Sequence, residues 1–386
     1  MTTELLGYLR PNGSWGFRDH VLVVPLHSAL CDVAEESALA VDPDIVSLRH
    51  DWDNPAGHGD AERAHRVLHG FATNANVGAV LVLGLGPDTH SLAAALTANS
   101  TEHAVVRLDE AGGFARMRAM AEEELRRLHA AHVTPERQPA PWSALCLGLE
   151  CGGSDAFSGI TANPALGVAS DLLVEGGGTS ILAETTELLG AEHLLAQRAV
   201  TAEIGQQIID MVRRFERDVA RHGVDLIGSQ PAPGNIVGGL STIEEKSLGA
   251  ARKGGTGPIS GVLDFAEPPS TTGLFIMDTP GQDIEQMSGM VAAGANIVGF
   301  TTGRGTPTGS PIAPCLKIST NSDVAQRLPD LIDINAGTII DGSATLEEVG
   351  AQILEAVIAA ASGRLTKSEL RRNREFAISR VRPMGV

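Results

Sequence analysis

The sequence predicts an α/β protein, with a parallel-sheet N-terminal domain followed by a larger, loop-rich α/β region. Hydrophobic residues make up 43% of the 386 residues but aromatic residues only 3%, so the core must be packed from aliphatic side chains. Short apolar, β-branched segments alternate with helical ones, and many of the 44 glycines follow the expected strands. A chain of this length is expected to form more than one domain.

The first third of the chain has the pattern of a βαβ domain. Buried parallel strands are expected at Val21–Leu26, Asp44–Leu48, Gly78–Gly84 and His103–Leu108. Helices are expected between and after them, at Ser28–Ala40, Asp60–Thr73, Ser91–Thr97 and Gly113–His132. The proline-rich stretch Thr134–Trp142 then indicates a boundary, which gives an N-terminal α/β domain over residues 1–138.

The remaining chain repeats the alternation with longer loops. Strands are expected at Ala144–Leu149, Gly261–Phe265, Leu274–Met277, Ile297–Phe300 and Leu331–Ile334. Helices are expected across Gly190–Gly223, over Leu346–Ala361 and from Ser368 onward. We therefore expect a central catalytic domain over residues 139–330 and a C-terminal segment, residues 331–386, that packs on the core.

Charge and cysteine content narrow the possible partners and location. The net charge of −18 argues against nucleic acid, which requires a basic face. We find no signal-peptide pattern and no apolar stretch of membrane-spanning length. The four cysteines show no paired spacing, so we expect reduced thiols in a cytoplasmic protein.

Five glycine-containing loops with charged or amide side chains are candidates for the site. They contain Cys151–Asp155, Glu184–His193, Asn235–Lys253, Asp278 and Arg304. Ligands of parallel α/β sheets bind outside the carboxyl ends of the strands, where such loops lie. Lysine can act as a base or hold a carboxylate, arginine can grip a carboxylate with two hydrogen bonds, and carboxylate, imidazole and thiolate groups can bind a divalent metal.

Each of these signals also has a structural explanation. His193 lies in an Ala/Leu-rich helical segment, where a histidine is more often an ordinary core or surface residue than a ligand. Cys146 and Cys315 lie in apolar, strand-like segments that are typical of buried inert thiols. The turn Gly84–Asp88 (GLGPD) resembles a phosphate-binding turn, but two glycines without a complete motif are weak evidence.

Several longer segments resemble one known family in the same order along the chain. They are LECGGSDAFSGITANPALG, GTSILAETTELLGAEHLL, PGNIVGGLSTIEEKSLGAARKGG and ANIVGFTTGRGTPTGSPIAPCLKIST. These segments resemble the altronate/galactarate dehydratase family, which includes the large subunit of sulfolactate sulfo-lyase. The resemblance implies elimination from a polyhydroxy or sulfonated acid and a divalent metal, Fe(II) or alternatively Mn(II).

The chain departs from the family pattern in two places. The small N-terminal domain of many members is missing, so a separate small subunit is one expectation. Cysteines expected in the family are replaced in Arg49–His58 and at Pro87. The metal site is therefore either altered, with harder ligands such as His50, or absent.

These observations lead to a set of expected site residues. We expect Lys246, Lys253, His193 and Glu184 to be catalytic, Ser154, Asn163, Asn235, Arg304 and Asp278 to bind substrate, and Cys151, Asp155, Cys31 and His50 to bind the metal. The expected reaction is dehydration of an aldonate or aldarate to a 2-keto-3-deoxy product by a homo-oligomer that acts on a small anionic hydroxy acid. The alternatives are a carbon–sulfur lyase that releases sulfite from sulfolactate, and a non-catalytic or metal-free relative that binds a sugar acid.

Overall fold

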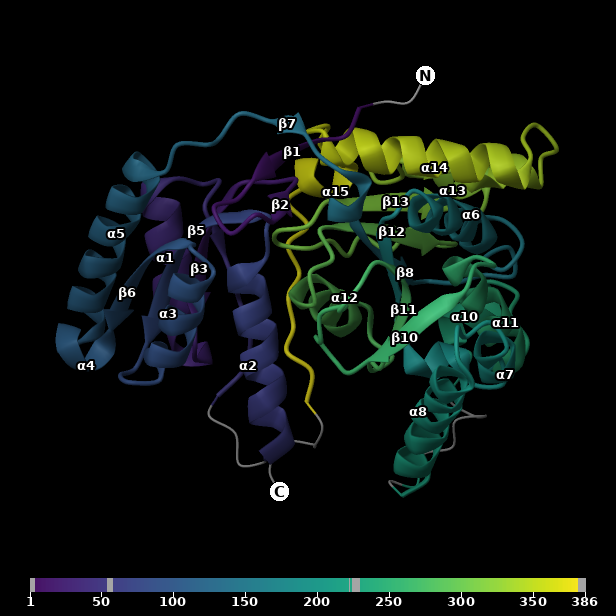
Figure 1. Ribbon diagram of the computed structural model, residues 1–386, viewed down its shortest axis with the longest axis horizontal. Coiled ribbons are helices and arrows are strands. Elements are labelled where there is room, and N and C mark those ends of the chain that lie inside the picture. The colour runs from purple at the N-terminus through teal and green to yellow at the C-terminus, as the bar shows by residue number, and fades with distance from the viewer. Residues whose placement is uncertain (1–3, 54–57, 222, 224–229, 381–386) are drawn as a thin grey trace.

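A computed structural model describes residues 4–53, 58–221, 223 and 230–380 of the chain and shows two parallel sheets side by side (Figure 1). The N-terminal sheet has the strand order β4-β3-β5-β6. Its strands are β3 (His20–Pro25), β4 (Val46–Ser47), β5 (Val77–Gly84) and β6 (Glu102–Arg107). Its helices are α1 (Cys31–Val41), α2 (His58–Thr73), α3 (Thr89–Ala98), α4 (Leu108–Ala111) and α5 (Phe114–Ala131), with the 3₁₀ turn η1 (Ser28–Leu30) before α1.

The second sheet has seven parallel strands in the order β10-β11-β9-β8-β12-β13-β14. They are β8 (Cys146–Cys151), β9 (Thr179–Leu182), β10 (Ile259–Leu263), β11 (Gly273–Met277), β12 (Ile297–Thr302), β13 (Cys315–Ser319) and β14 (Ile334–Asn335). A small antiparallel sheet of β1 (Leu6–Leu9), β2 (Trp15–Gly16) and β7 (Gln138–Pro139) lies where the chain passes between the two. The prediction of an α/β fold with a smaller and a larger parallel sheet is confirmed.

Helices cover both faces of the large sheet. They are α6 (Ala162–Glu175), α7 (Glu192–Ala196), α8 (Ala202–Arg221), α10 (Pro233–Val237), α11 (Ile243–Ala251), α12 (Asp283–Ala292), α13 (Ser322–Arg327), α14 (Leu346–Ala361) and α15 (Lys367–Leu370). The 3₁₀ turns are η2 (Trp142–Ala144), η3 (Thr185–Leu188), η4 (Arg252–Gly254) and η5 (Ala336–Ile339). None of the helices in these ranges is long and apolar enough to cross a membrane.

The expectation of one helix across Gly190–Gly223 is wrong, because two helices occupy this stretch. Helix α7 ends at Ala196, and α8 begins at Ala202. Between them the Val200 amide donates to the Ile259 carbonyl, 3.0 Å away, and Ala199 forms a bridge with Ile259. This pairing with β10 satisfies the backbone outside a helix and breaks the helical run.

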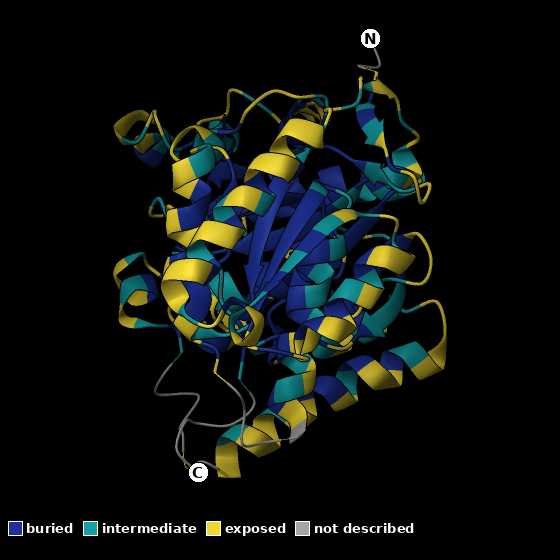
Figure 2. Ribbon diagram, turned by 90° about the vertical axis from the view of Figure 1, so that its left-hand side faces the viewer, coloured by how far each residue is buried: buried dark blue, intermediate teal, exposed yellow. Residues whose placement is uncertain are grey.

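The two sheets share a hydrophobic core. Figure 2 shows buried strands in dark blue beneath partly exposed helices. Helix α2 on the N-terminal sheet packs against α12 on the large sheet. Buried Phe71 of α2 contacts Phe376 of the C-terminal tail, with ring centroids 4.7 Å apart. The tail, drawn in yellow in Figure 1, runs between the two halves. Burial of such rings contributes several kcal/mol each, so the halves stabilise one another.

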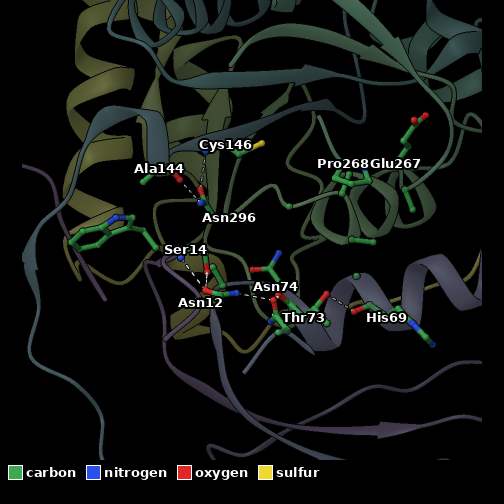
Figure 3. A pocket seen from close by; sticks show the side chains of 18 of the residues that line it. Asn12, Ser14, His69, Thr73, Asn74, Ala144, Cys146, Glu267, Pro268 and Asn296 are labelled. Atoms are coloured by element: carbon green, nitrogen blue, oxygen red, sulfur yellow. Dashed lines mark hydrogen bonds between the residues drawn. The ribbon is translucent and has the colours of Figure 1, made fainter. Parts of the chain in front are cut away.

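Two asparagine side chains also join the halves, beside a groove of about 820 Å³ (Figure 3). The Asn74 amide donates to the Val291 carbonyl at 2.8 Å, and the Asn76 amide donates to the Asn296 carbonyl at 2.9 Å. The Asn296 amide donates in turn to the Ala144 carbonyl at 2.7 Å. The sheets are thus connected by buried hydrogen bonds as well as by apolar packing.

A buried ion pair lies at the start of β3, close to the asparagine contacts. Asp19 contacts Arg10 Nη1 at 2.5 Å and His132 Nε2 at 2.7 Å. Although burial acts to raise it, the hydrogen bonds from His132 and Arg10 lower the pKa of Asp19 from 3.8 to about 2. The ionised form is therefore stabilised by folding.

Replacing Asp19 by Asn is expected to lower the free energy of unfolding at pH 7 by on the order of 2 kcal/mol, because a pKa shift is also a stability difference. Since the folded-state pKa is lowered, this contribution is present above about pH 4 and is lost as the pH falls toward about 2. Urea denaturation at pH 7 and at about pH 3 measures it. The exposed variant Asp323→Asn is the control, and an equal deficit for D19N at both pH values would contradict the assignment.

Candidate active site

The carboxyl edge of the large sheet carries a cluster of buried charged side chains. The chain passes from β8 to β9 on one side, and β12 lies on the other side of β8, so the strand order reverses at β8. Ligands of open parallel sheets bind outside such a reversal. Cys151 is the last residue of β8, and Glu184 follows β9 by two residues.

Five side chains meet at this edge. The Lys253 ammonium lies 2.8 Å from Cys151 Sγ and 3.1 Å from Glu187 Oε2, and the Cys151 thiol donates to the same Glu187 oxygen at 2.9 Å. On the other side, Lys246 Nζ lies 3.2 Å from Glu187 Oε1 and 4.0 Å from Glu184 Oε1. Glu187 therefore lies between two ammonium groups.

Short local elements hold these side chains in place. Glu184 has a left-handed backbone (φ 75°), which is unusual for a residue with a side chain, and its amide donates to Thr279 Oγ1 at 2.6 Å. This bend starts η3, which carries Glu187. Lys246 comes from α11, and Lys253 comes from η4 directly after it. Strained backbone held by surrounding bonds is common at functional sites.

Burial and the neighbouring charges shift the pKa values of Glu184 and Glu187 in opposite directions. Burial and the neighbouring Glu187 charge raise the pKa of Glu184 well above its ordinary value. Burial also acts to raise the pKa of Glu187, but Lys253 and Lys246 lower it to about 2. The surroundings therefore favour the protonated form of Glu184 and the ionised form of Glu187, the separation that acid–base chemistry needs.

A second buried layer lies behind the cluster. Glu150, Gln286 and Lys317 are each fully buried. Their side-chain polar atoms have no hydrogen-bond partner among the described residues. Lys317 Nζ lies 3.2 Å from the centroid of the Phe300 ring, and Phe300 pairs with both Glu150 and Lys317 across the sheet. Buried polar atoms of this kind normally bind internal water.

The structure brings together four residues of the sequence prediction, Cys151, Glu184, Lys246 and Lys253. Three others line the loops around them. Ser154 Oγ lies 3.7 Å from Cys151 Sγ, and the Asn235 amide donates to the Ser154 carbonyl at 2.9 Å. Arg304 is exposed, and its guanidinium lies against Gly234, where an added Cβ would be 2.0 Å from Nη1.

The remaining expected site residues have side chains that bond within the surrounding fold or lie outside the cluster. Asp155 accepts from Thr320 Oγ1 at 2.8 Å and from Asn321 at 3.1 Å, and Asn163 bonds to Thr301 and Gly249. Asp278 accepts from Thr185 and Arg214, and His193 is exposed on α7. Cys31 and His50 belong to the N-terminal domain, where both His50 ring nitrogens bond to backbone groups.

Two buried acids of the site, Glu150 and Glu187, were not among the expected residues. A signal for Glu187 was present, because Glu184 and Glu187 are three residues apart and one helical turn places such residues on the same side. Glu150 directly follows the expected strand Ala144–Leu149, and nothing in the surrounding sequence marked it as a site residue.

Cys151, Glu184 and Glu187 are also a plausible set of metal ligands. One ligand atom from each lies within 4.8 Å of the others, and all three side chains are buried. Glu184 Oε2 has no hydrogen-bond partner among the described residues, so one acceptor is free for an ion. A thiolate with two carboxylates suits a divalent transition metal, and the donor set therefore fits such an ion.

Comparisons with known proteins cover almost the whole chain. Residues 142–384 match the family model "D-galactarate/Altronate dehydratase, C-terminal", and residues 7–132 match "D-galactarate dehydratase/Altronate hydrolase, second domain". Altronate dehydratase of Bacillus subtilis is 35% identical over 96% of this chain and 76% of its own length. The beta subunit of (2R)-sulfolactate sulfo-lyase of Chromohalobacter salexigens is 35% identical over 97% of both chains. Galactarate dehydratase (L-threo-forming) of Escherichia coli is 38% identical over 78% of this chain and 59% of its own length.

Proposed function

Because the chain belongs to the D-galactarate/altronate dehydratase family, we propose that it is a hydro-lyase that removes water from a sugar acid. The observation that carries this proposal is the buried pair of a protonated Glu184 and an ionised Glu187 between two lysines. Dehydration next to a carboxylate needs a base, an acid and positive charge for the enediolate-like intermediate. The cluster supplies all three.

The lysines bind the substrate carboxylate in this proposal. When Lys246 and Lys253 turn to that carboxylate, Glu187 loses its two cationic partners while it remains buried. Its pKa then rises, because burial disfavours a carboxylate without a partner. Glu187 becomes a base strong enough to take the proton from the carbon next to the substrate carboxylate.

The leaving group departs with a proton from Glu184. Breaking the carbon–oxygen bond at the next carbon releases hydroxide, which the Glu184 carboxyl proton converts to water. The resulting enol becomes the 2-keto-3-deoxy acid. Glu184 and Glu187 share a hydrogen bond, through which the proton returns from Glu187 to Glu184 for the next turnover. A divalent metal held by Cys151, Glu184 and Glu187 would supply Lewis-acid assistance as an alternative to the proton transfers of Glu184 and Glu187.

Glu184→Gln is the variant that tests the acid. Turnover of altronate or galactarate is expected to fall about 10²- to 10⁴-fold, because the amide cannot donate an acidic proton to the leaving hydroxyl. Formation of 2-keto acid by folded protein, supplied with Fe(II) under anaerobic conditions, is the measurement. Glu203→Gln, an exposed change on α8, is the matched control. Unchanged turnover of E184Q, or wild-type inactivity on a broad panel of sugar acids, would contradict the proposal.

A carbon–sulfur lyase is the second candidate, because the sulfo-lyase beta subunit is as similar to this chain as the Bacillus altronate dehydratase. Sulfite is a better leaving group than hydroxide and needs no proton at departure. We therefore expect E184Q to retain sulfite release from sulfolactate if this reaction is the native one. Assaying sulfite and 2-keto acid with the same variant separates the two candidates.

A further inference from the structure

The N-terminal sheet has a cavity of its own at its carboxyl edge, separate from the active-site cluster. Its volume is about 160 Å³, and its wall includes His27, Trp52, His65, His69 and Asp88. The chain passes from β3 to β4 on one side and then to β5 on the other, so the strand order reverses at β3. His27 follows β3 and Asp88 follows β5, which places the cavity where ligands of parallel sheets bind.

Three imidazole groups face this cavity from two directions. His65 and His69 are one helical turn apart on α2, and their rings are parallel within 8°, with centroids 5.8 Å apart. His27 enters from the loop after β3. In Figure 3 the His69 side chain lies at the margin of the groove and points away from Asn296 and Cys146. Two histidines four residues apart on one helix face are a recurrent metal-binding pair.

Asp88 orients the third imidazole. His27 Nε2 lies 3.0 Å from Asp88 Oδ2, and an ionised carboxylate only accepts hydrogen bonds. The His27 proton is therefore on Nε2, which leaves the Nδ1 lone pair free. Histidines that bind metals usually donate their other ring N–H to a carboxylate in this way.

We propose that His27, His65 and His69 form a binding site for a divalent transition-metal ion, with Asp88 orienting His27. Imidazole nitrogen is a common ligand of zinc, copper, nickel and iron. Within the described ranges, Cys151, Glu184 and Glu187 are the only group of three possible ligands whose ligand atoms lie within 4.8 Å of one another. Binding at the three histidines therefore requires their side chains to rotate toward the ion, and His65 is exposed and has room to do so. The site does not depend on the proposed dehydratase reaction.

Cobalt(II) titration of metal-free protein distinguishes this site from the thiol-containing one. A cobalt ion bound by Cys151 gives a thiolate charge-transfer band, whereas a histidine site gives only visible ligand-field bands. In the C151S/E187Q background we expect one cobalt ion per chain without the thiolate band. Adding H65A and H69A is expected to weaken its binding about 100-fold or more, because two of three ligands are lost. Asp88→Asn is expected to weaken binding by about 10- to 100-fold, the usual range for a group that orients a metal ligand.

His129→Ala is the control, because His129 is exposed on α5 and faces Asp42 instead of the cavity. Cobalt affinity that is unchanged by H65A/H69A, or reduced as much by H129A, would overturn the proposal. If C151S/E187Q does not fold, the number of cobalt ions bound per chain is compared between the wild type and H65A/H69A, with the thiolate band as the internal reference. Loss of one bound cobalt ion in H65A/H69A with the thiolate band retained supports the site, and an unchanged number rejects it.

Discussion

Replacing Lys253 by Met is expected to reduce turnover by about 10²- to 10³-fold or more and to lower the free energy of unfolding by about 3–5 kcal/mol. Lys253 is 1% exposed and contacts both Cys151 and Glu187. Burial opposes its charge, but Cys151 and Glu187 raise the pKa of Lys253 well above its usual value, so the ammonium is the stable form. Without it, the Glu187 carboxylate keeps only Lys246 as a cationic partner. Chemical denaturation and 2-keto acid assays measure the two effects.

The double variant Lys253→Met/Glu187→Gln separates stability from catalysis. Removing both charges eliminates the unpaired carboxylate, so most of the lost stability is expected to return while turnover stays low. Recovery of both stability and turnover would show that Lys253 and Glu187 act only in folding. A K253M variant that keeps full activity would rule out the proposed carboxylate clamp.

Gly167→Ala is expected to reduce both stability and turnover from a position outside the charged cluster. Gly167 lies inside α6, where Ala would normally favour the helix by about 0.5–1 kcal/mol. A Cβ at this position would be 2.2 Å from the Arg252 carbonyl oxygen and 2.9 Å from Gly255 Cα. These backbone atoms belong to the turn that carries Lys253. The turn must move, at a net cost of about 1–3 kcal/mol.

The expected kinetic result for Gly167→Ala is a lower kcat together with a higher KM. A displaced Lys253 would bind the substrate carboxylate less well in the enzyme–substrate complex and would stabilise the transition state less. Gly177→Ala is the comparison variant, because its backbone is left-handed (φ +92°) but an added Cβ meets no atom within 4 Å. That variant is expected to lose stability while retaining turnover. A gain in stability for G167A would show that η4 can move without cost.

Sequence patterns predicted the strands best where apolar, β-branched residues were contiguous. The expected strand Gly78–Gly84 corresponds to β5 (Val77–Gly84), since an interior strand buried on both faces reads as an apolar run. Strand β13 was anticipated only as a strand-like segment at Cys315, because Lys317 at its centre interrupts the apolar run. Helix α6 was missed because its first half, with Asn163, Pro164 and Gly167, is rich in residues that normally end helices. Close packing against η4 requires the glycine and outweighs its low helix propensity.

The site was predicted where loops follow strands and less well where distant segments meet. Cys151 and Glu184 were expected at the site because strand ends carry ligand-binding loops, and the structure places both in the buried cluster. The contact of Lys253 with Cys151 joins residues 102 positions apart, which no local pattern reports. Asp155 and Asn163 were expected at the site because they are polar residues beside glycines, yet their side chains bond within the fold. Local composition cannot distinguish a ligand-binding polar group from one that holds a loop.

The asparagine contacts between the two sheets have a consequence for how substrate reaches the cluster. Asn74 and Asn76 bond across the boundary while buried, and helices α2 and α12 pack on one shared core. Opening the two halves like a hinge would break these bonds and expose that core at the same time, so we expect the halves to unfold together in a single calorimetric transition. Entry of substrate and release of product must therefore rely on small movements of the loops after β8, β9 and β12, and hydrogen exchange should be fast in those loops and slow at the asparagine contacts.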